Sequence, residues 1–236
     1  MSPPGRPKGE FRSAQHEGTP VIAPRRPRVL LADDHLMVAE ALKSLLAPEF
    51  DLVGVVEDGR AMVEAAGRLR PDVIVADVTM PQLNGIDALV QLRQHGDPVP
   101  VVFLTMHRDA SFARRALDAG ASGFVLKHSA PAELVTAIRA ALAGQTYLTP
   151  QLAGEVLESM KQGPQQAGGS LGALTPRQRE VLQLAAEGQS AKQIAAALGI
   201  SPRTVEFHKY QAMEALGLHT NAELIHFAIK HGLVER

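Results

Sequence analysis

The chain has 236 residues, of which 45% are hydrophobic and 21% charged, as in a soluble globular protein with room for two domains. It has no cysteine, which excludes disulfides, a thiolate nucleophile and a cysteine zinc site. Its 24 basic and 25 acidic residues give a formal net charge of −1, so it lacks the strong positive charge of many nucleic-acid-binding proteins. No run approaches the roughly 18 apolar residues that a membrane span needs, so we expect no membrane partner.

Residues 1–27 are rich in proline and glycine and show no apolar periodicity. This composition predicts a disordered N-terminal tail. The tail also lacks the apolar core of a secretory signal, so we expect a cytoplasmic protein.

Residues 28–143 alternate short apolar runs with helical patterns. The apolar runs predict buried strands at 28–32, 52–56, 72–76, 99–104 and 123–126. Helices are expected at 35–47, 58–69, 84–95, 108–119 and 131–143. Five strand–helix units predict an α/β domain built on a doubly wound, five-stranded parallel sheet.

Residues 144–173 are expected to form a linker, with a short helix near 150–160 and a flexible part at 162–172. Residues 174–236 have a purely helical pattern, with helices expected at 176–187, 190–198, 202–215 and 221–231. Hydroxyl residues precede three of these helices and should be their N-caps, namely Thr175, Ser190 and Ser201. The second domain should therefore be all-α, and its short helices with tight turns suit a helix-turn-helix domain.

Polar side chains stand where the predicted strands of the first domain end. They are Asp33, Asp34, Asp77, Thr105 and Lys127. Ligands of doubly wound sheets bind at this edge. Because crowded carboxylates repel one another, they favour a hard divalent cation, and Mg²⁺ is the cofactor we expect. A carboxylate beside such an ion can attack a phosphoryl group while Lys127 neutralises the developing charge.

Simpler interpretations exist for each of these residues taken singly. A lone aspartate at a strand end is most often a helix cap or turn former, and only the combination favours phosphoryl chemistry. His35, which follows the acidic pair, is more simply the start of a helix than a ligand or base. A phosphatase using Asp77 as its nucleophile would need a second aspartate two residues on, where Thr79 stands. We therefore expect that the protein is not an enzyme and that it has no catalytic residues.

Four segments of the first domain resemble the receiver domain of NarL/FixJ-type response regulators: LLADDH, DVIVADVTMPQLNGIDAL, VVFLTMH and AGASGFVLK. The resemblance implies that Asp77 is the phospho-acceptor and that Asp33, Asp34, Asp77 and the carbonyl of Thr79 bind Mg²⁺. It implies phosphoryl-binding roles for Thr105 and Lys127 and a switching role for Phe124. It also implies that a sensor histidine kinase is the phosphate donor, and that His107 and Thr79 influence hydrolysis of the acyl phosphate.

The helix expected at 202–215 would be the recognition helix, which lies in the major groove in helix-turn-helix proteins. Its outward residues, to varying degrees, should be Arg203, Thr204, Glu206, Phe207, Lys209 and Tyr210. Helical spacing alone does not exclude a small bundle for protein contacts. The segments LTPRQREVL, IAAALGIS and TVEFH, however, resemble the LuxR-type DNA-binding domain, which implies that double-stranded DNA is a partner.

The acidic residues of the second domain depart from this resemblance. Glu206 takes a position often filled by Lys, and Glu214 and Ala215 replace a basic pair. Because phosphate neutralisation dominates DNA affinity, an interaction module with weak or no DNA binding stays an alternative. The resemblance implies a phosphorylation-dependent homodimer, formed partly by an apolar stripe on the last helix: Leu224, Ile225, Ala228 and Ile229. We expect the unphosphorylated chain to be a monomer with its DNA-binding face partly covered.

Overall fold

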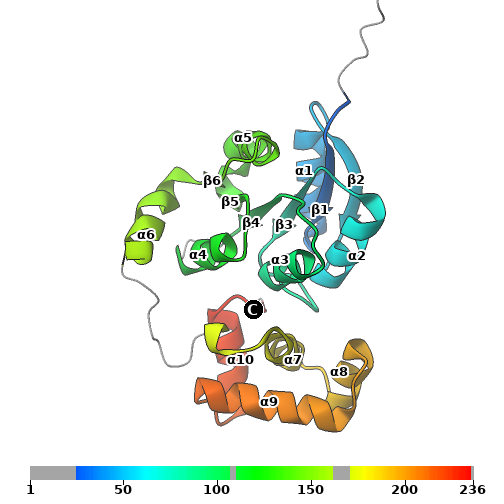
Figure 1. Cartoon of the computed structure of the whole chain (residues 1–236), viewed down its shortest axis with the longest axis vertical. Coiled ribbons are helices and arrows are strands. Elements are labelled where there is room, and N and C mark those ends of the chain that lie inside the picture. Colours follow the sequence, from blue (N-terminus) through cyan, green and yellow to red (C-terminus); the bar gives the residue numbers. More distant parts are fainter. Residues whose placement is uncertain (1–24, 107–109, 162–170, 235–236) are drawn as a thin grey trace, which may run out of the picture.

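The structure is a computed structural model that describes residues 25–106, 110–161 and 171–234. It contains a sheet domain, a helix beside it and a helical domain (Figure 1). The predicted tail at residues 1–24, most of the predicted flexible linker (162–170) and His107 lie outside the described residues.

All six strands of the sheet run parallel, in the order β2-β1-β3-β4-β5-β6. The strands are β1 (Arg28–Ala32), β2 (Asp51–Val56), β3 (Val73–Asp77), β4 (Val101–Thr105), β5 (Gly123–Leu126) and β6 (Tyr147–Leu148). The expected doubly wound sheet is confirmed, with one strand more than predicted. Strand β6 has only two residues, too few to show a periodicity in the sequence.

Five helices cover the two faces of the sheet. They are α1 (Leu36–Leu46), α2 (Gly59–Leu69), α3 (Gly85–Gln94), α4 (Ala110–Asp118) and α5 (Ala130–Leu142). Helices α1 and α5 lie on one face, and α2, α3 and α4 lie on the other, toward the helical domain (Figure 1). The strands β3, β4 and β5 are buried along their whole length because both of their faces are covered.

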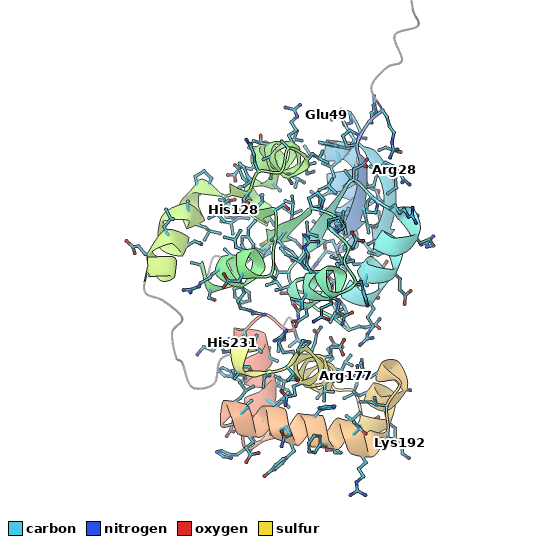
Figure 2. All side chains as sticks on the ribbon, viewed as in Figure 1. Arg28, Glu49, His128, Arg177, Lys192 and His231 are labelled. Atoms are coloured by element: carbon cyan, nitrogen blue, oxygen red, sulfur yellow. The ribbon has the colours of Figure 1, made fainter. Side chains whose placement is uncertain are left out.

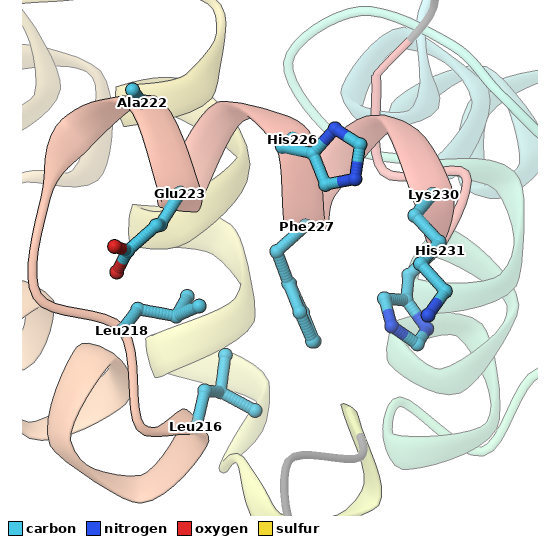
Figure 3. Close-up of a pocket in the computed structure, with 8 residues that line it drawn as sticks. All are labelled: Leu216, Leu218, Ala222, Glu223, His226, Phe227, Lys230 and His231. Carbon is cyan, nitrogen blue, oxygen red and sulfur yellow. The ribbon is translucent and has the colours of Figure 1, made fainter.

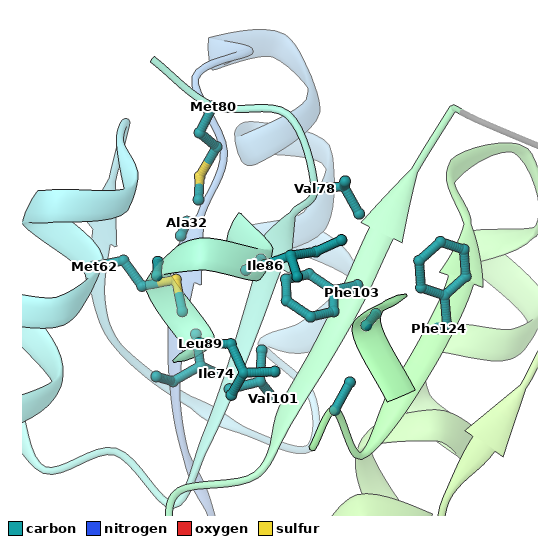
Figure 4. Close-up of a cluster of buried hydrophobic side chains, with 14 of the residues drawn as sticks. Ala32, Met62, Ile74, Val78, Met80, Ile86, Leu89, Val101, Phe103 and Phe124 are labelled. Atoms are coloured by element: carbon teal, nitrogen blue, oxygen red, sulfur yellow. The ribbon is translucent and has the colours of Figure 1, made fainter. Parts of the chain in front are cut away.

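The larger apolar core lies between the sheet and α2, α3 and α4 (Figure 4). Ile74 and Phe103 enter it from neighbouring strands, and both are fully buried. Helix α6 (Pro150–Lys161), within the predicted linker, adds Leu152 and Val156 to the same core. This helix is therefore packed onto the sheet domain.

The second domain consists of α7 (Pro176–Ala186), α8 (Ala191–Leu198), α9 (Pro202–Leu216) and α10 (Asn221–Lys230). Thr175, Ser190 and Ser201 each accept a hydrogen bond at the start of a helix, as predicted. The N-terminus of α8 is closed by a capping box, in which Gln193 accepts a hydrogen bond from the Ser190 backbone N–H. The short 3₁₀ turn η2 (Leu171–Ala173) precedes α7.

Two expectations for the second domain need correction. Leu171, placed in the flexible linker, is 4% exposed and packs in the core of the helical domain. Leu224 and Ala228 of the expected dimer stripe are 1% and 0% exposed and belong to the same core, so they cannot also form a surface. Of that stripe, Ile225 is exposed and Ile229 is half-buried.

None of the helices in the described ranges is long and apolar enough to cross a membrane.

Candidate functional site

Three acidic residues meet at the carboxyl edge of the sheet. Asp77 is the last residue of β3, and Asp33 and Asp34 directly follow β1. Asp33 is 1% exposed and Asp77 3% exposed. Gly85 allows the start of α3 to lie against this edge, because a Cβ at that position would stand 2.1 Å from the carbonyl oxygen of Asp77.

Lys127 reaches this acidic cluster from the end of β5. Its Nζ lies 2.5 Å from Oδ2 of Asp77 and 2.9 Å from Oδ2 of Asp33. Burial alone would lower the pKa of the Lys127 ammonium, but the two carboxylates raise it above its ordinary value. Lys127 therefore stays charged and holds the buried carboxylates together.

The carboxyl group of Asp77 has a raised pKa of about 6. Burial is the largest cause, and the charge of Asp33 adds to it, whereas Lys127 lowers the pKa through its charge and its hydrogen bond. The carboxyl is thus ionised at neutral pH and protonated in mild acid.

The acidic cluster fits a divalent cation. Three carboxylates (Asp33, Asp34, Asp77) and the one ammonium of Lys127 leave a formal charge of −2. Two buried carboxylate oxygens, Oδ2 of Asp33 and Oδ1 of Asp34, have no hydrogen bond, although Lys127 pairs with the first at 2.9 Å. Buried carboxylate oxygens in a site of net negative charge, one of them with neither a hydrogen bond nor a lysine partner, are the ligands that Mg²⁺ or a similar ion would take.

The other expected members of the site lie on neighbouring elements. Thr105 ends β4 and is fully buried, and Thr79, two residues after Asp77, is 2% exposed. Phe124 is also fully buried, within the larger core (Figure 4). Its ring is therefore inside the protein in this structure.

His35 was interpreted from the sequence as the start of a helix, yet its side chain lies within the acidic cluster. It is the N-cap of α1, as expected, but its side chain makes no capping hydrogen bond. Instead its Nδ1 stands 3.2 Å from Oδ1 of Asp33, 3.1 Å from Oδ1 of Asp34 and 4.0 Å from Oδ2 of Asp77. In the sequence, only the position of His35 directly after Asp33 and Asp34 indicated a place in the site. A side chain at the start of a helix can point toward the site or away from it, so this position did not decide the matter.

A second candidate surface lies on α9, the expected recognition helix. Arg203, Glu206, Phe207 and Tyr210 are exposed, the two aromatic side chains by 58% and 65%. Thr204 and Lys209 are half-buried, and the Thr204 hydroxyl contacts Ser201 Oγ at 2.8 Å. In Figure 1, α9 lies on the side of its domain that is turned away from the sheet.

Helix α7, not α9, packs against the sheet domain. Gln183 is buried there and donates to the carbonyl of Met80 at 2.8 Å, while its side-chain oxygen accepts from the backbone N–H of Asn84 at 2.9 Å. Glu187 accepts from the backbone N–H of Gln82 at 2.9 Å. Gln183 of α7 and Glu187, the residue that caps the end of α7, thus bind the loop that directly follows Asp77.

Charged groups surround this contact. Arg179 donates to Asp87 at 2.7 Å, and Gln91 donates to Glu180 at 2.6 Å. At the end of α10, a Cβ on Gly232 would lie 2.3 Å from the ring of Phe112 in α4, so the two domains approach closely there as well. His231, labelled in Figure 2, lies at this contact, where its backbone carbonyl accepts a hydrogen bond from Arg115 of α4 at 3.2 Å.

A pocket of about 270 Å³ lies between α10 and the loop after β3. Thr79, Met80 and Pro81 line one side of it, beside Asp34, and Ile225, Ile229 and Val234 line the other. Ile225 and Ile229 of the expected dimer helix thus line a pocket that reaches Asp34 of the acidic cluster. A separate hollow of about 560 Å³ lies between α10 and the end of α9, around Phe227 (Figure 3).

A doubly wound sheet with an acidic carboxyl edge, followed by a helix-turn-helix, defines the class of response regulators. Residues 29–139 match the response regulator receiver domain, and residues 172–228 match the LuxR family of bacterial regulatory proteins. The chain belongs to the LuxR-type response regulators, transcriptional regulators that join a receiver to a DNA-binding domain.

Relatives of known identity match nearly the whole chain. The response regulator GacA of Pseudomonas viridiflava is 33% identical over 211 residues, which cover 88% of this chain and 98% of GacA. UvrY of Escherichia coli K12 is 30% identical over 207 residues, which cover 87% and 94% of the two chains. The solved RcsB response regulator of Salmonella typhimurium aligns with a TM-score of 0.61 at 28% identity, covering 87% and 98%.

Proposed function

We propose that this protein is a phosphorylation-controlled, DNA-binding transcriptional regulator of the cytoplasm that takes its phosphate from a sensor histidine kinase. Residues 28–143 would act as the receiver and 174–236 as the DNA-binding domain. The observation that carries the proposal is the contact of Asp77 with Lys127, which also contacts Asp33, in a buried site of net negative charge. A phosphatase would need a second aspartate two residues after Asp77, where Thr79 stands, so we propose a regulator and not an enzyme.

Asp77 is the proposed phospho-acceptor. One of its carboxylate oxygens attacks the phosphorus of a phosphohistidine, the P–N bond breaks, and its electron pair returns to the imidazole of the donor. Asp33, Asp34, Asp77 and the carbonyl oxygen of Thr79 would hold Mg²⁺, which screens the phosphoryl charge when bound. Lys127 would pair with the phosphoryl oxygens, and the hydroxyl of Thr105 would donate to one of them.

Helix α9 is the proposed DNA-reading element. Its candidate contacts are Arg203, Thr204, Glu206, Phe207, Lys209 and Tyr210. Four of these side chains are exposed on a helix turned away from the receiver, which supports contact with a groove. A structure of the related RcsB bound to DNA, which aligns at 28% identity and a TM-score of 0.54, supports the same use of this domain.

The contact between the domains is the proposed means of control. We call the arrangement in which α7 contacts the loop after β3 the closed arrangement. In it α9 stays exposed, so the receiver does not block the reading helix. This differs from our expectation of a partly covered DNA-binding face. Ile225 and Ile229 of α10 instead face the loop after β3. We propose that closure withholds this side of α10 from a second copy of the chain, and that phosphorylation of Asp77 releases it for a DNA-binding dimer.

Sedimentation and DNA retardation test this function directly. The full chain is treated with Mg²⁺ and beryllofluoride, a phosphoryl mimic, and we expect it to change from monomer to dimer and to retain DNA more strongly. Dimerisation without DNA retention would support the interaction module instead, which the acidic Glu206 on the reading face favours. An unchanged mass and unchanged DNA affinity would contradict the proposed control.

Phosphorylation should depend on pH near the pKa of Asp77. Burial raises this pKa to about 6, so the nucleophilic carboxylate is present above pH 6 and is lost as the pH falls through it. We expect labelling by acetyl phosphate at low Mg²⁺ to fall about tenfold per pH unit below that value. More Mg²⁺ should move the decline to lower pH, because metal and proton compete for Asp77.

Lys127→Met is the matched test of this pH dependence. Because Lys127 lowers the pKa of Asp77, its removal should move the decline to higher pH. A decline at the same pH in both proteins, measured at several Mg²⁺ concentrations, would mean that Asp77 does not control it.

Charge on α9 should control the affinity for DNA. Lys209→Ala should weaken retention of all sequences and reduce the slope of log affinity against log salt by about 0.9, the effect of losing one phosphate contact. Glu206→Lys should strengthen retention and steepen the slope. Lys43→Ala, in α1 of the receiver, is the control and should leave both unchanged. If Lys209 and Glu206 behave like Lys43, α9 is not the reading helix.

A further inference from the structure

His35 is placed at the proposed metal site, next to the carboxylates. Its Nδ1 and one oxygen from each of Asp33, Asp34 and Asp77 all lie within 4.8 Å of one another. Ligand atoms bound about 2.0–2.2 Å from one ion lie roughly 3–4 Å apart. The distances from Nδ1 to the three carboxylate oxygens run from 3.1 to 4.0 Å, so a single ion could bind all four atoms.

Hydrogen bonding accounts for only part of this arrangement. The imidazole can donate one N–H from Nδ1, and it makes a hydrogen-bonding contact with Oδ1 of Asp33 at 3.2 Å. Oδ1 of Asp34 is at a similar distance, 3.1 Å, yet it is buried without a hydrogen bond. Oδ2 of the buried Asp33, in contrast, is already paired with Nζ of Lys127 at 2.9 Å. A cation bound by the ring nitrogen and the two carboxylates would therefore satisfy the buried oxygen of Asp34, which hydrogen bonding leaves over.

We propose that His35 is a nitrogen ligand of this site, which therefore accepts first-row transition-metal ions such as Co²⁺ and Zn²⁺ as well as Mg²⁺. The inference rests on the proposed metal site formed by Asp33, Asp34 and Asp77. Imidazole is a preferred ligand of Zn²⁺ and its neighbours, whereas Mg²⁺ prefers oxygen and retains water. His35 thus sets which ion the receiver selects, and Mg²⁺ can still bind through the carboxylates.

Metal titrations of the full chain and of His35→Ala test the inference. Removal of the imidazole should lower the affinity for Co²⁺ and Zn²⁺ by at least about tenfold, the loss that follows when even an outer partner of a metal ligand is removed. The affinity for Mg²⁺ should change less than threefold. The side chain of His35 makes no capping hydrogen bond, so the substitution leaves the start of α1 intact. His128→Ala, an exposed histidine next to Lys127, is the control and should bind all three ions like the parent.

Nuclear magnetic resonance of the Co²⁺-loaded protein gives an independent measurement. We expect one shifted, exchangeable imidazole N–H signal, which is present in the parent and in His128→Ala and absent in His35→Ala. Equal Co²⁺ affinity and equal spectra in all three proteins, with Mg²⁺ still bound, would overturn the role of His35 and leave the oxygen site standing. If the parent protein itself binds no Mg²⁺, the proposed metal site as a whole is contradicted.

Discussion

We expect Asp77→Asn to abolish phosphate incorporation from a histidine kinase or from acetyl phosphate. The new bond forms at a carboxylate oxygen, and the uncharged amide is too weak a nucleophile to replace it. The amide is close in shape and can still accept a hydrogen bond from Lys127, which contacts Asp77 at 2.5 Å. The fold should therefore survive, and circular dichroism can verify this.

Radioactive labelling measures the effect, with Asp118→Asn as the control. Asp118 is exposed on α4 and should keep full labelling after the same chemical change. Unreduced stoichiometry in Asp77→Asn would place the acceptor elsewhere. The same variant should show no beryllofluoride-induced dimer, which connects the chemistry of the site to its output.

Gln183→Leu should open the closed arrangement without any phosphorylation. In the closed chain the new side chain leaves the carbonyl of Met80 and the N–H of Asn84 without their present partner. Each buried unsatisfied group costs about 1–3 kcal/mol, so the ratio of closed to open molecules should fall by at least about 30-fold. Because the open chain exposes the outer side of α10, unphosphorylated Gln183→Leu should dimerise and retain DNA more strongly than the parent.

Hydrogen exchange gives the specific measurement. The backbone N–H groups of Gln82 and Asn84 are bonded across the domain contact, and they should exchange faster in Gln183→Leu. Exchange within β3 should not change. Gln151→Leu, an exposed substitution in α6, is the control. Unaltered exchange at both amides, together with an unaltered radius of gyration, would mean that Gln183 does not hold the domains together.

The core elements of both domains were predictable because their signals are local. Strands covered on both faces must be apolar along their length, so β3, β4 and β5 appear as continuous hydrophobic runs. Helix starts require particular capping residues, and Thr175, Ser190 and Ser201 were found in that role. Strand β6 was not predicted because its two residues are too few to show the alternation of apolar and polar residues that is typical of a strand.

Part of the candidate site followed from the topology. Parallel strands end at a common edge, so Asp33, Asp77 and Lys127 could be placed together before their distances were known. The orientation of a side chain at the start of a helix has no such rule. His35 could point into the site or away from it, and only the packed structure places its ring among the carboxylates.

The sequence by itself determined the class of this protein, its two domains and the residues at the edge of the sheet. Periodicity, capping and the order of strand ends depend on neighbours in the chain or on the topology of parallel sheets. Only the tertiary structure decided that α7 rather than α9 meets the receiver and that Leu224 and Ala228 belong to a core. These contacts join residues about a hundred positions apart, such as Gln183 and Met80, and they depend on how two complete surfaces fit, which no local pattern specifies.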